Sequence, residues 1–350
     1  MSNNTLSVIT GATGHVGYAL LLDLINNGEK TRVVAINERD GERVADLNCE
    51  IVYGDVTNLD TLVEAFKGAD VVYHLAGMVE IKAGYEDLIY NVNVKGTKNV
   101  VEACKKCGVK KLVYMSSVDT YSPLPDNQLM TELDHYDPDI LEGAYAKTKA
   151  EATQYVLDSN GKDGLETVVI QPSACIGPYD INVSSIGEMV RMYMEGKFPV
   201  SLGFGGYNFV DVRDIAYGTR IAATKGKPGE CYILCGDAMS VDDFIKALAA
   251  SEHKKPPKVK LSKGFIDAII PIMEVYYKAT KATPFLTSYS VRKLISNCNF
   301  SYAKAQRDLD YHPMSVEQSV KDMIKWIRDN EGDLKDPEVK KRKKAAKKSA

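Results

Sequence analysis

The sequence predicts an α/β fold, in which a doubly wound parallel sheet is followed by a smaller C-terminal lobe that binds the substrate. Three observations support this fold class. The glycine-rich segment GATGHVG (11–17) directly follows an apolar, β-branched run. Strand-like and helix-like segments then alternate, which is the order that produces a parallel sheet with right-handed crossovers. This alternation ends after Pro172.

Six strands are expected before that break. Each is a nearly continuous apolar run, as in strands that are buried on both faces of a sheet, and they span residues 6–10, 31–36, 49–55, 69–77, 110–117 and 166–173. The helices follow from apolar residues at helical spacing, three of them with a glycine at the end, and they span residues 15–28, 58–68, 93–108 and 143–160. Such strands with a phosphate-binding turn in the first unit form the Rossmann arrangement.

These elements divide the chain into three parts. Residues 1–173 are expected to form the dinucleotide-binding Rossmann domain, and residues 208–228 to return to it. Residues 174–330 are expected to form the substrate-binding lobe. Residues 331–350 make up a basic tail that we expect to be disordered, because 339–350 carry seven Lys and Arg residues and no acid.

Composition excludes several function classes. The net charge of the chain is −3, so the residues before the basic tail are acidic, which argues against nucleic acid as the main partner. The N-terminus has no apolar segment of the kind found in secretory signals, and the longest apolar stretch, 265–277, is too short and too interrupted to span a membrane. We therefore expect a cytoplasmic protein with reduced cysteines. Cys104 and Cys107 form a CxxC pair, but no second ligand pair lies nearby at zinc-ligand spacing, so no metal site is expected.

The glycine segment predicts a dinucleotide-binding turn. Gly11 permits a tight turn, Gly14 lets backbone N–H groups approach a pyrophosphate, and Gly17 lets the following helix pack against the sheet. The positive end of that helix then faces the phosphates. The other residues of the segment expected at the cofactor are Thr13, His15 and Val16.

The end of the second strand leaves the choice between NAD and NADP open. The segment AINERD places Asn37 there, followed by Glu38 and Arg39. An acidic residue at this point favours NAD through the ribose hydroxyls, whereas an arginine favours NADP through the 2′-phosphate. Asp55 and Val56 follow the third strand and are expected at the adenine. The alternative for Asp55 is that it caps the next helix.

Tyr145 and Lys149 form the most informative pair in the chain, because they share one helix face four residues apart. A free phenol has a pKa of about 10. We expect the Lys149 ammonium and the nicotinamide charge to lower the pKa of Tyr145 toward neutrality, which would make it a general acid and base. A hydroxyl at the end of the fifth strand, from Ser116 or Ser117, with Thr120 as a third option, would hold a substrate carbonyl.

Seven motifs then occur in a particular order and spacing: TGATGHVG, YGDVTN, HLAG, NVNVKGTKNVVEAC, LVYMSS, YAKTK and FVDVRD. As a set they resemble the extended short-chain dehydrogenase/reductase superfamily, also called the NAD-dependent epimerase/dehydratase superfamily, from about residue 6 to residue 328. Within it, NVNVKGT and VYMSS look like the 3β-hydroxysteroid dehydrogenase and dihydroflavonol reductase branch. One departure is Gln171, where the superfamily often has an arginine.

The resemblance implies roles for individual residues. Tyr145 would be the acid/base, Lys149 its partner and a ligand of the nicotinamide ribose, and Ser117 the carbonyl-binding hydroxyl. Asn93 would support the active-site helix next to the cofactor. The remaining residues implied at the cofactor are Leu75, Ala76, Gly77, Pro172 and Ser173. The resemblance also implies a dimer formed through the helices that hold residues 93–107 and 144–158.

The predicted function is the NAD(P)-dependent interconversion of a secondary alcohol and a ketone on a bulky hydrophobic substrate, such as a 3β-hydroxysteroid. Apolar residues after the last Rossmann strand are expected to form either the wall of the substrate site or the core of the lobe: Met189, Met192, Tyr193, Met194, Phe198 and Phe204. Further candidates for the wall are Phe265, Ile269, Tyr276 and Tyr277.

Two other functions are compatible with the same motifs. A nucleotide-sugar epimerase or reductase would need basic residues aimed at a pyrophosphate, and the lobe around Arg191 and Arg213 offers few. A non-catalytic NAD(P)-sensing protein would be expected to lack the Tyr or the Lys of the pair, whereas both are present. His74, at the end of the fourth strand, is expected to pack beside the cofactor rather than to take part in catalysis.

Overall fold

The centre of the molecule is a seven-stranded parallel sheet in the order β10-β6-β5-β4-β1-β2-β3. The computed structural model describes residues 5–79, 84–125, 128–198, 200–280 and 287–332, without the side chains of residues 276 and 278–280. The strands of the sheet are β1 (Leu6–Thr10), β2 (Lys30–Ala35), β3 (Glu50–Tyr53), β4 (Val71–His74), β5 (Lys111–Met115), β6 (Glu166–Pro172) and β10 (Glu230–Leu234). The prediction of a Rossmann-type parallel sheet is thereby confirmed.

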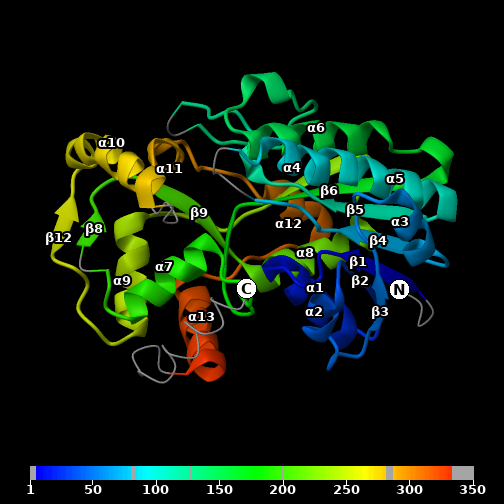
Figure 1. Cartoon of the computed structure of the whole chain (residues 1–350), viewed down its shortest axis with the longest axis horizontal. Coiled ribbons are helices and arrows are strands. Elements are labelled where there is room, and N and C mark those ends of the chain that lie inside the picture. The colour runs from blue at the N-terminus through cyan, green and yellow to red at the C-terminus, as the bar shows by residue number, and fades with distance from the viewer. Residues whose placement is uncertain (1–4, 80–83, 126–127, 199, 281–286, 333–350) are drawn as a thin grey trace.

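Two layers of helices cover the two faces of this sheet (Figure 1). Val8 and Val72 pack toward one layer, and Ile9 and Tyr73 pack toward the other. The first layer contains α3 (Leu59–Phe66), α5 (Gly96–Cys107) and α6 (Ala144–Asp158). The second contains α1 (His15–Asn26), α8 (Val212–Lys225) and α12 (Ala303–Leu309). Because both faces are buried, the strands are apolar at successive positions.

The segments after β6 form a second core at one end of the sheet (Figure 1). It contains a three-stranded sheet in the order β11-β9-β7, whose strands are β7 (Ala174–Ile176), β9 (Gly206–Asp211) and β11 (Asp237–Ser240). A two-stranded sheet pairs β8 (Val200–Leu202) with β12 (Val259–Leu261). The helices here are α7 (Ser185–Met194), α9 (Val241–Ser251), α10 (Lys263–Thr280), α11 (Ser288–Ile295) and α13 (Val316–Glu331).

Short helices connect these elements. They are α2 (Glu38–Glu42), α4 (Glu86–Tyr90), the π-helical turn η1 (Asn91–Lys95) and the 3₁₀ turns η2 (Val118–Thr120), η3 (Pro138–Ile140) and η4 (Lys162–Gly164). α4, η1 and α5 follow one another without a break, so the predicted helix over 93–108 starts earlier and contains a π turn.

After the second core begins, the chain returns to the main sheet twice, first with α8 and β10 and later with α12. Helix α8 packs against α1, and β10 pairs in parallel with β6 at the edge of the sheet.

The domain limits stay a prediction, as does the dimer. Among the described residues, none of the helices combines the length and the apolar character needed to cross a membrane. From residue 333 on, the expected basic tail lies outside the described residues.

Candidate active site

The turn between β1 and α1 has no room for a side chain at two positions. Gly11 has a φ of +77°, and a Cβ there would lie 2.5 Å from the backbone nitrogen of Ala76. A Cβ on Gly17 would lie 2.0 Å from the carbonyl oxygen of Gly11. Helix α1 begins directly after Gly14, its N-cap residue, and the backbone N–H groups of a first helical turn have no partners within the helix. The turn therefore fits a dinucleotide pyrophosphate.

The ends of β2 and β3 lie side by side next to this turn. The Asn37 side chain caps α2 by accepting a hydrogen bond from the Asp40 N–H at 3.0 Å, and Arg39 on this short helix is exposed. The Asp55 carboxylate accepts a hydrogen bond from the Thr57 N–H at 2.8 Å.

Helix α3 is capped by Asn58, whose side chain accepts from two backbone N–H groups at the start of the helix. The alternative role of Asp55 as the cap of this helix is therefore wrong. Val56 is 9% exposed and packs against Gly96, where a Cβ would lie 2.9 Å from a Val56 methyl carbon. The place of Asp55 and Val56 at the adenine stays a prediction.

Arg39→Ala is expected to weaken NADPH binding about tenfold or more and to leave NADH binding within about twofold. The exposed guanidinium can donate charge-assisted hydrogen bonds to the 2′-phosphate, worth roughly 1.5–3 kcal/mol, and NADH has no such phosphate. Fluorescence titration with both reduced cofactors measures the effect. Arg43→Ala is the control, since Arg43 pairs with Asp40 at 3.4 Å. Equal losses for NADH and NADPH in the Arg39 variant would contradict this role.

His74, at the end of β4, is held between two threonines. Its ring nitrogens lie 2.8 Å from the Thr10 hydroxyl and 3.0 Å from the Thr97 hydroxyl. Burial, and to a lesser extent the charge of Lys149, lower the pKa of His74 to about 3. The ring therefore stays neutral at physiological pH, which supports the packing role over a catalytic one.

The chain leaves β4 alongside the glycine turn. The Leu75 N–H donates to the Thr10 carbonyl oxygen at 3.0 Å, and the Ala76 N–H donates to the Thr10 hydroxyl at 3.3 Å. Gly77 comes next, and a Cβ there would lie 3.5 Å from the Lys149 Nζ. The three residues expected to line the cofactor thus run from the glycine turn to Lys149.

Asn93 lies in the π turn η1 and is almost fully buried. Its Oδ1 accepts a hydrogen bond from the Met78 N–H at 2.7 Å. Its Nδ2 donates to the Met78 carbonyl oxygen at 3.0 Å and to the Thr148 hydroxyl at 3.3 Å. π turns occur often at functional sites. Here the turn lets one side chain tie the loop after β4 to the helix that carries Tyr145 and Lys149.

Lys149 points inward from α6 to the end of β5. Its Nζ donates to the Met115 carbonyl oxygen at 2.6 Å and to the Tyr114 hydroxyl at 3.3 Å. The same nitrogen lies 4.8 Å from the centre of the Tyr114 ring. Burial lowers the pKa of Lys149 to about 7, so the amine is close to half protonated at neutral pH.

The cofactor-free protein is expected to lose thermal stability relative to Lys149→Met as the pH falls from about 10 to about 7. In this range an unfolded lysine, with a pKa of about 10.4, holds its proton, while folded Lys149, with its pKa of about 7, has largely released it. Stability rises with pH wherever the unfolded state binds more protons, and below about pH 7 the full penalty is present. Melting temperatures of both proteins across this range measure the difference. Parallel curves would contradict the lowered pKa.

The structure gives the neighbouring serines different roles. The Ser116 hydroxyl lies 2.6 Å from that of Thr153 on α6 and is buried there. The Ser117 Oγ accepts a hydrogen bond from the Asp119 N–H at 3.1 Å, and Ser117 lines a cavity. A hydroxyl that accepts in this way still has one proton to donate, either to Tyr145 or to a substrate oxygen. Thr120 donates to the Ser117 carbonyl oxygen at 2.8 Å and is buried.

Tyr145 lies in the first turn of α6, and its hydroxyl is close to that of Ser117. Burial raises the pKa of Tyr145, the charge of Asp119 raises it further, and a side-chain hydrogen bond with Ser117 acts in the opposite direction. The expectation that Lys149 lowers this pKa is therefore wrong for the cofactor-free protein. Desolvation of the phenolate has the largest effect on this pKa, and Lys149 is not among the groups that shift it.

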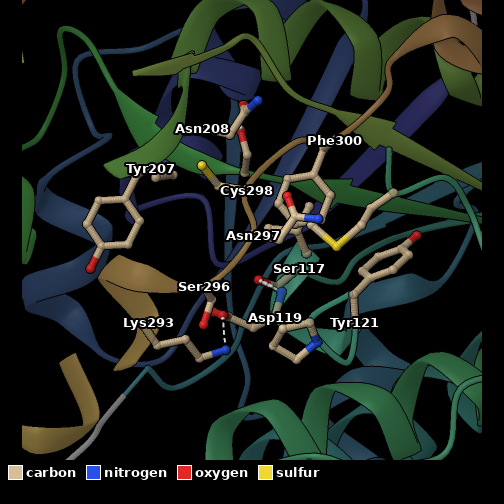
Figure 2. A pocket seen from close by; sticks show the side chains of 15 residues that line it. Ser117, Asp119, Tyr121, Tyr207, Asn208, Lys293, Ser296, Asn297, Cys298 and Phe300 are labelled. Atoms are coloured by element: carbon tan, nitrogen blue, oxygen red, sulfur yellow. Dashed lines mark hydrogen bonds and ion pairs between the residues drawn. The ribbon is translucent and has the colours of Figure 1, made fainter. Parts of the chain in front are cut away.

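A cavity of about 160 Å³ opens beside Ser117 (Figure 2). Lys293 reaches into it from α11, and its Nζ lies 2.8 Å from the Asp119 Oδ1. Tyr121, Tyr207 and Phe300 supply aromatic rings to its lining. A second cavity of about 380 Å³ shares Asp119, Tyr121 and Lys293 with the first. Together they reach the size of sites for drug-sized ligands, roughly 300–1,000 Å³.

The residues expected to form the substrate wall lie elsewhere. Tyr193 and Met194 are buried in the core of the lobe, and Met189, Phe198, Phe204 and Ile269 pack against that core, while Phe265 is exposed. None of the described residues named for the wall, Met192 and Tyr277 included, lines the cavity beside Ser117. The side chain of Tyr276 lies outside the described residues. Of the two alternatives, the core of the lobe is therefore the one confirmed for Met189, Tyr193, Met194, Phe198 and Phe204, and the wall alternative is wrong for the cavity beside Ser117.

Gln171 binds Tyr121, a residue that lines the cavity, within a network of uncharged hydrogen bonds. It is fully buried in β6, and its Oε1 accepts from the Tyr121 hydroxyl at 2.7 Å and from the Tyr136 hydroxyl at 3.0 Å. Its Nε2 donates to the Thr120 hydroxyl at 3.0 Å. Next to it, Ser173 lines the cavity and donates to the Asn208 Oδ1 at 2.8 Å. The role of Pro172 and Ser173 at the nicotinamide stays a prediction.

Comparison with known proteins agrees with this geometry. The model of the 3-beta hydroxysteroid dehydrogenase/isomerase family matches residues 8–226. "Sterol demethylase protein B" of Methylococcus capsulatus is 25% identical over 92% of this chain and 98% of its own length. A 3-beta-hydroxysteroid dehydrogenase of Mycolicibacterium neoaurum is 26% identical over 92% of this chain and 91% of its own length.

Solved structures share the fold over almost the whole chain. The crystal structure of gox2253 is 30% identical, with a TM-score of 0.81, and covers 94% of this chain and 99% of its own. The NAD complex of UDP-glucuronic acid 4-epimerase from Bacillus cereus is 19% identical, with a TM-score of 0.73, and covers 94% of this chain and 98% of its own. The second likeness is one of fold alone.

Proposed function

The chain belongs to the 3-beta hydroxysteroid dehydrogenase/isomerase family, within the NAD(P)-dependent oxidoreductases that act on CH–OH groups, and we propose that its substrate is a 3β-hydroxysteroid-like secondary alcohol or the matching ketone. One observation carries the proposal. Ser117 lines a cavity with an aromatic wall, and its hydroxyl lowers the pKa of Tyr145, which places the two side chains next to each other. Relatives named for sterol and 3β-hydroxysteroid reactions match most of this chain's length.

The proposed roles follow from the contacts of each side chain. A bound nicotinamide would supply the hydride chemistry. The Ser117 oxygen accepts a hydrogen bond from the Asp119 N–H. The Ser117 hydroxyl donates a hydrogen bond to the substrate oxygen. During reduction the Tyr145 phenol gives its proton to the carbonyl oxygen. During oxidation its phenolate, which the positive charge of a bound oxidised nicotinamide would favour, takes the alcohol proton. Lys149 is fixed by the Met115 carbonyl oxygen and faces Gly77, from which it can reach the nicotinamide ribose.

The contacts of the lobe cations disfavour a nucleotide-sugar substrate. Such a substrate needs positive charges for its pyrophosphate. The Arg191 guanidinium is enclosed by Asp180 and Glu331, and the Arg213 guanidinium contacts Asp211 and Asp322 at 2.8 Å each. Both arginines named as candidates for that role are therefore already neutralised by carboxylates.

The decisive experiment is a turnover assay with a matched pair of substrates. Purified protein is mixed with NAD⁺ or NADP⁺ and a 3β-hydroxysteroid, its 3α epimer or UDP-glucose, and formation of the reduced cofactor is followed by absorbance. We expect turnover of the 3β alcohol, at least about tenfold less with the 3α epimer, and none with UDP-glucose. Turnover of UDP-glucose alone would replace the proposal with the nucleotide-sugar alternative, and no turnover with any compound would reject the steroid class.

A further inference from the structure

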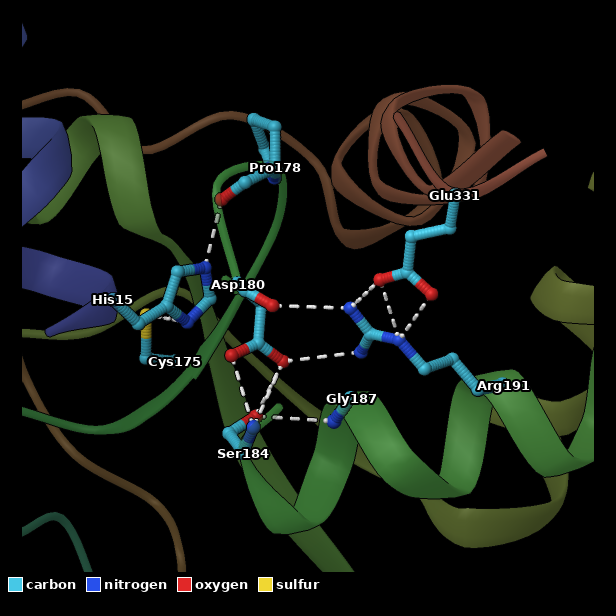
Figure 3. Close-up of polar contacts among 8 residues, drawn as sticks. All are labelled: His15, Cys175, Pro178, Asp180, Ser184, Gly187, Arg191 and Glu331. Carbon is cyan, nitrogen blue, oxygen red and sulfur yellow. Dashed lines mark hydrogen bonds and ion pairs between the residues drawn. The ribbon is translucent and has the colours of Figure 1, made fainter. Parts of the chain in front are cut away.

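The segment Gly177–Ser184, which joins β7 to α7, lies against the glycine turn (Figure 3). The Asn182 Nδ2 donates to the Thr13 carbonyl oxygen at 2.7 Å. The His15 Nε2 lies 2.7 Å from the Pro178 carbonyl oxygen. The Tyr179 ring packs against the ring of Tyr18 on α1, with centres 5.9 Å apart. We call this segment the strap, because it connects the lobe to the turn predicted to bind the pyrophosphate.

His15 joins the strap from two sides. A carbonyl oxygen only accepts hydrogen bonds, so the Nε2 must carry the proton that it donates to Pro178. In the neutral ring the Nδ1 is then an acceptor, and the Cys175 thiol lies 3.7 Å from it. The side chain of a residue in the phosphate turn is thus oriented by the strap and by β7 rather than by its own helix.

The backbone of the strap is strained. Tyr179 has a φ of +72° and Val183 a φ of +56°. This left-handed region is unfavourable for residues with a Cβ and most of all for a β-branched residue such as valine. Strain of this kind, of order 1–3 kcal/mol per residue, persists only where surrounding contacts impose it. The strap therefore needs a specific anchor between these two residues.

Asp180 is that anchor, and it is only 1% exposed. Its carboxylate accepts hydrogen bonds from the Ser184 N–H at 2.9 and 3.0 Å and from the Ser184 hydroxyl at 2.9 Å. Arg191 of α7 approaches the same carboxylate at 3.4 Å and donates to the Asp180 carbonyl oxygen at 3.0 Å. Side chain and backbone of one residue are thus both fixed by the lobe.

The anchor extends to the last helix of the described chain. The Arg191 guanidinium lies between Asp180 and Glu331 at the end of α13, and its Nε contacts the Glu331 carboxylate at 2.9 and 3.1 Å (Figure 3). Gly187 leaves the space that the pair needs, since a Cβ there would lie 1.7 Å from the Asp180 Oδ2. A buried ion pair of this kind is costly to break from one side only.

We propose that the strap closes over the phosphate-binding turn and that Asp180, held by Arg191, is the positioning residue that controls how long the dinucleotide stays bound. Asp180 lies in the lobe and acts through Asn182, Pro178 and the His15 ring. With its charge removed, the two left-handed residues can relax and the strap loses its contacts with the turn. The cofactor then dissociates faster while the groups at Ser117 and Tyr145 keep their places.

The test is the dissociation rate of the reduced cofactor from Asp180→Asn. Protein loaded with NADH or NADPH is mixed rapidly with an excess of the oxidised cofactor, and the loss of reduced-nicotinamide fluorescence is followed. The chain's single tryptophan, Trp326, packs against Tyr179 with ring centres 6.3 Å apart, so its emission reports on the strap in the same experiment. We expect dissociation about tenfold faster and a changed Trp326 emission.

Two further variants make the result decisive. Asn182→Ala removes the contact with Thr13 at an exposed position and is expected to speed dissociation about threefold without a change in melting temperature. Asp322→Asn is the matched control, because Asp322 lies on α13 like Glu331 but pairs with a different arginine, Arg213, rather than with Arg191. It is expected to leave the dissociation rate within about twofold.

Three outcomes overturn the proposal. They are unchanged dissociation in a folded Asp180→Asn protein, an equal acceleration in Asp322→Asn, and, if Asp180→Asn does not fold, unchanged dissociation in Asn182→Ala. A second readout separates positioning from general damage. Where cofactor release limits turnover, the Asp180 variant is expected to raise kcat, which a merely unfolding variant cannot do. The rate is measured without substrate, so it is independent of the steroid proposal.

Discussion

Tyr145→Phe is expected to lower kcat by about 10²–10⁴-fold, the contribution typical of a positioned general acid or base, with the dissociation constant of the cofactor changed by less than about twofold. The phenol is the group proposed to exchange a proton with a substrate oxygen held by Ser117, whose hydroxyl lowers the pKa of Tyr145. Phenylalanine keeps the ring in the first turn of α6 and removes only the hydroxyl. The assay is turnover with the substrate found in the epimer comparison, with cofactor binding followed by fluorescence.

A phenylalanine elsewhere on the same helix separates this effect from packing. Tyr155 also lies on α6, where Lys98 sits 5.4 Å from the centre of its ring. Tyr155→Phe is expected to keep kcat within about twofold. Full activity in Tyr145→Phe would reject the assigned acid/base. A natural protein that binds cofactor but shows no turnover with any alcohol or ketone would instead favour the NAD(P)-sensing alternative.

Gly17→Ala is expected to abolish measurable cofactor binding and to lower the free energy of unfolding by at least about 1–3 kcal/mol, the usual cost of overpacking. The new Cβ would lie 2.0 Å from the Gly11 carbonyl oxygen and 2.9 Å from the Ala12 Cα. Both are backbone atoms that cannot rotate away. Either the helix moves off the sheet or the turn opens, and each response displaces the N–H groups that face the pyrophosphate.

Gly28→Ala at the other end of α1 is the matched control. Gly28 has a φ of +74°, but nothing lies within 4 Å of the position its Cβ would take. This variant should lose roughly 1–2 kcal/mol from the left-handed backbone and bind cofactor normally. Melting temperatures with and without NADH and NADPH distinguish the two cases. A Gly17→Ala protein with a normal cofactor-induced rise in melting temperature would contradict the close packing of the turn.

Local sequence patterns predicted the dinucleotide-binding half well. The glycine turn is encoded within seven residues, and Tyr145 and Lys149 within five, so short-range spacing was sufficient to find them. The strands β1 to β6 are mostly contiguous apolar runs, so each could be recognised from its own few residues. Spacing could not choose between Ser116 and Ser117, because the choice depends on the direction of each side chain. One meets Thr153 on α6 and the other lines the cavity.

The substrate cavity could not be predicted in the same way. Its ion pair joins Asp119 to Lys293 across 174 positions of the chain. Met130, Tyr207 and Phe300 reach the cavity from three separate segments and share no periodicity. The strap was missed for a related reason. IGPYD looks like an ordinary loop, and only the fold shows that its aspartate is buried against an arginine of the next helix.

Some of the residues that line the cavity come from a different stretch of the chain than those proposed to act on the substrate oxygen. Ser117, which follows β5, and Tyr145 on α6 are the residues proposed to act on the substrate oxygen. Lys293, Ser296 and Phe300, in contrast, all belong to the short run from 287 to 300. The run from 287 to 300 could be replaced as one segment. It begins at Thr287, the N-cap of α11, and contains none of the three residues proposed to take part in the reaction, Ser117, Tyr145 and Lys149. Grafting the corresponding run from a relative should redirect which alcohol is accepted while leaving hydride transfer intact. Variants of this run would therefore show how much of the choice of alcohol one stretch of the chain determines.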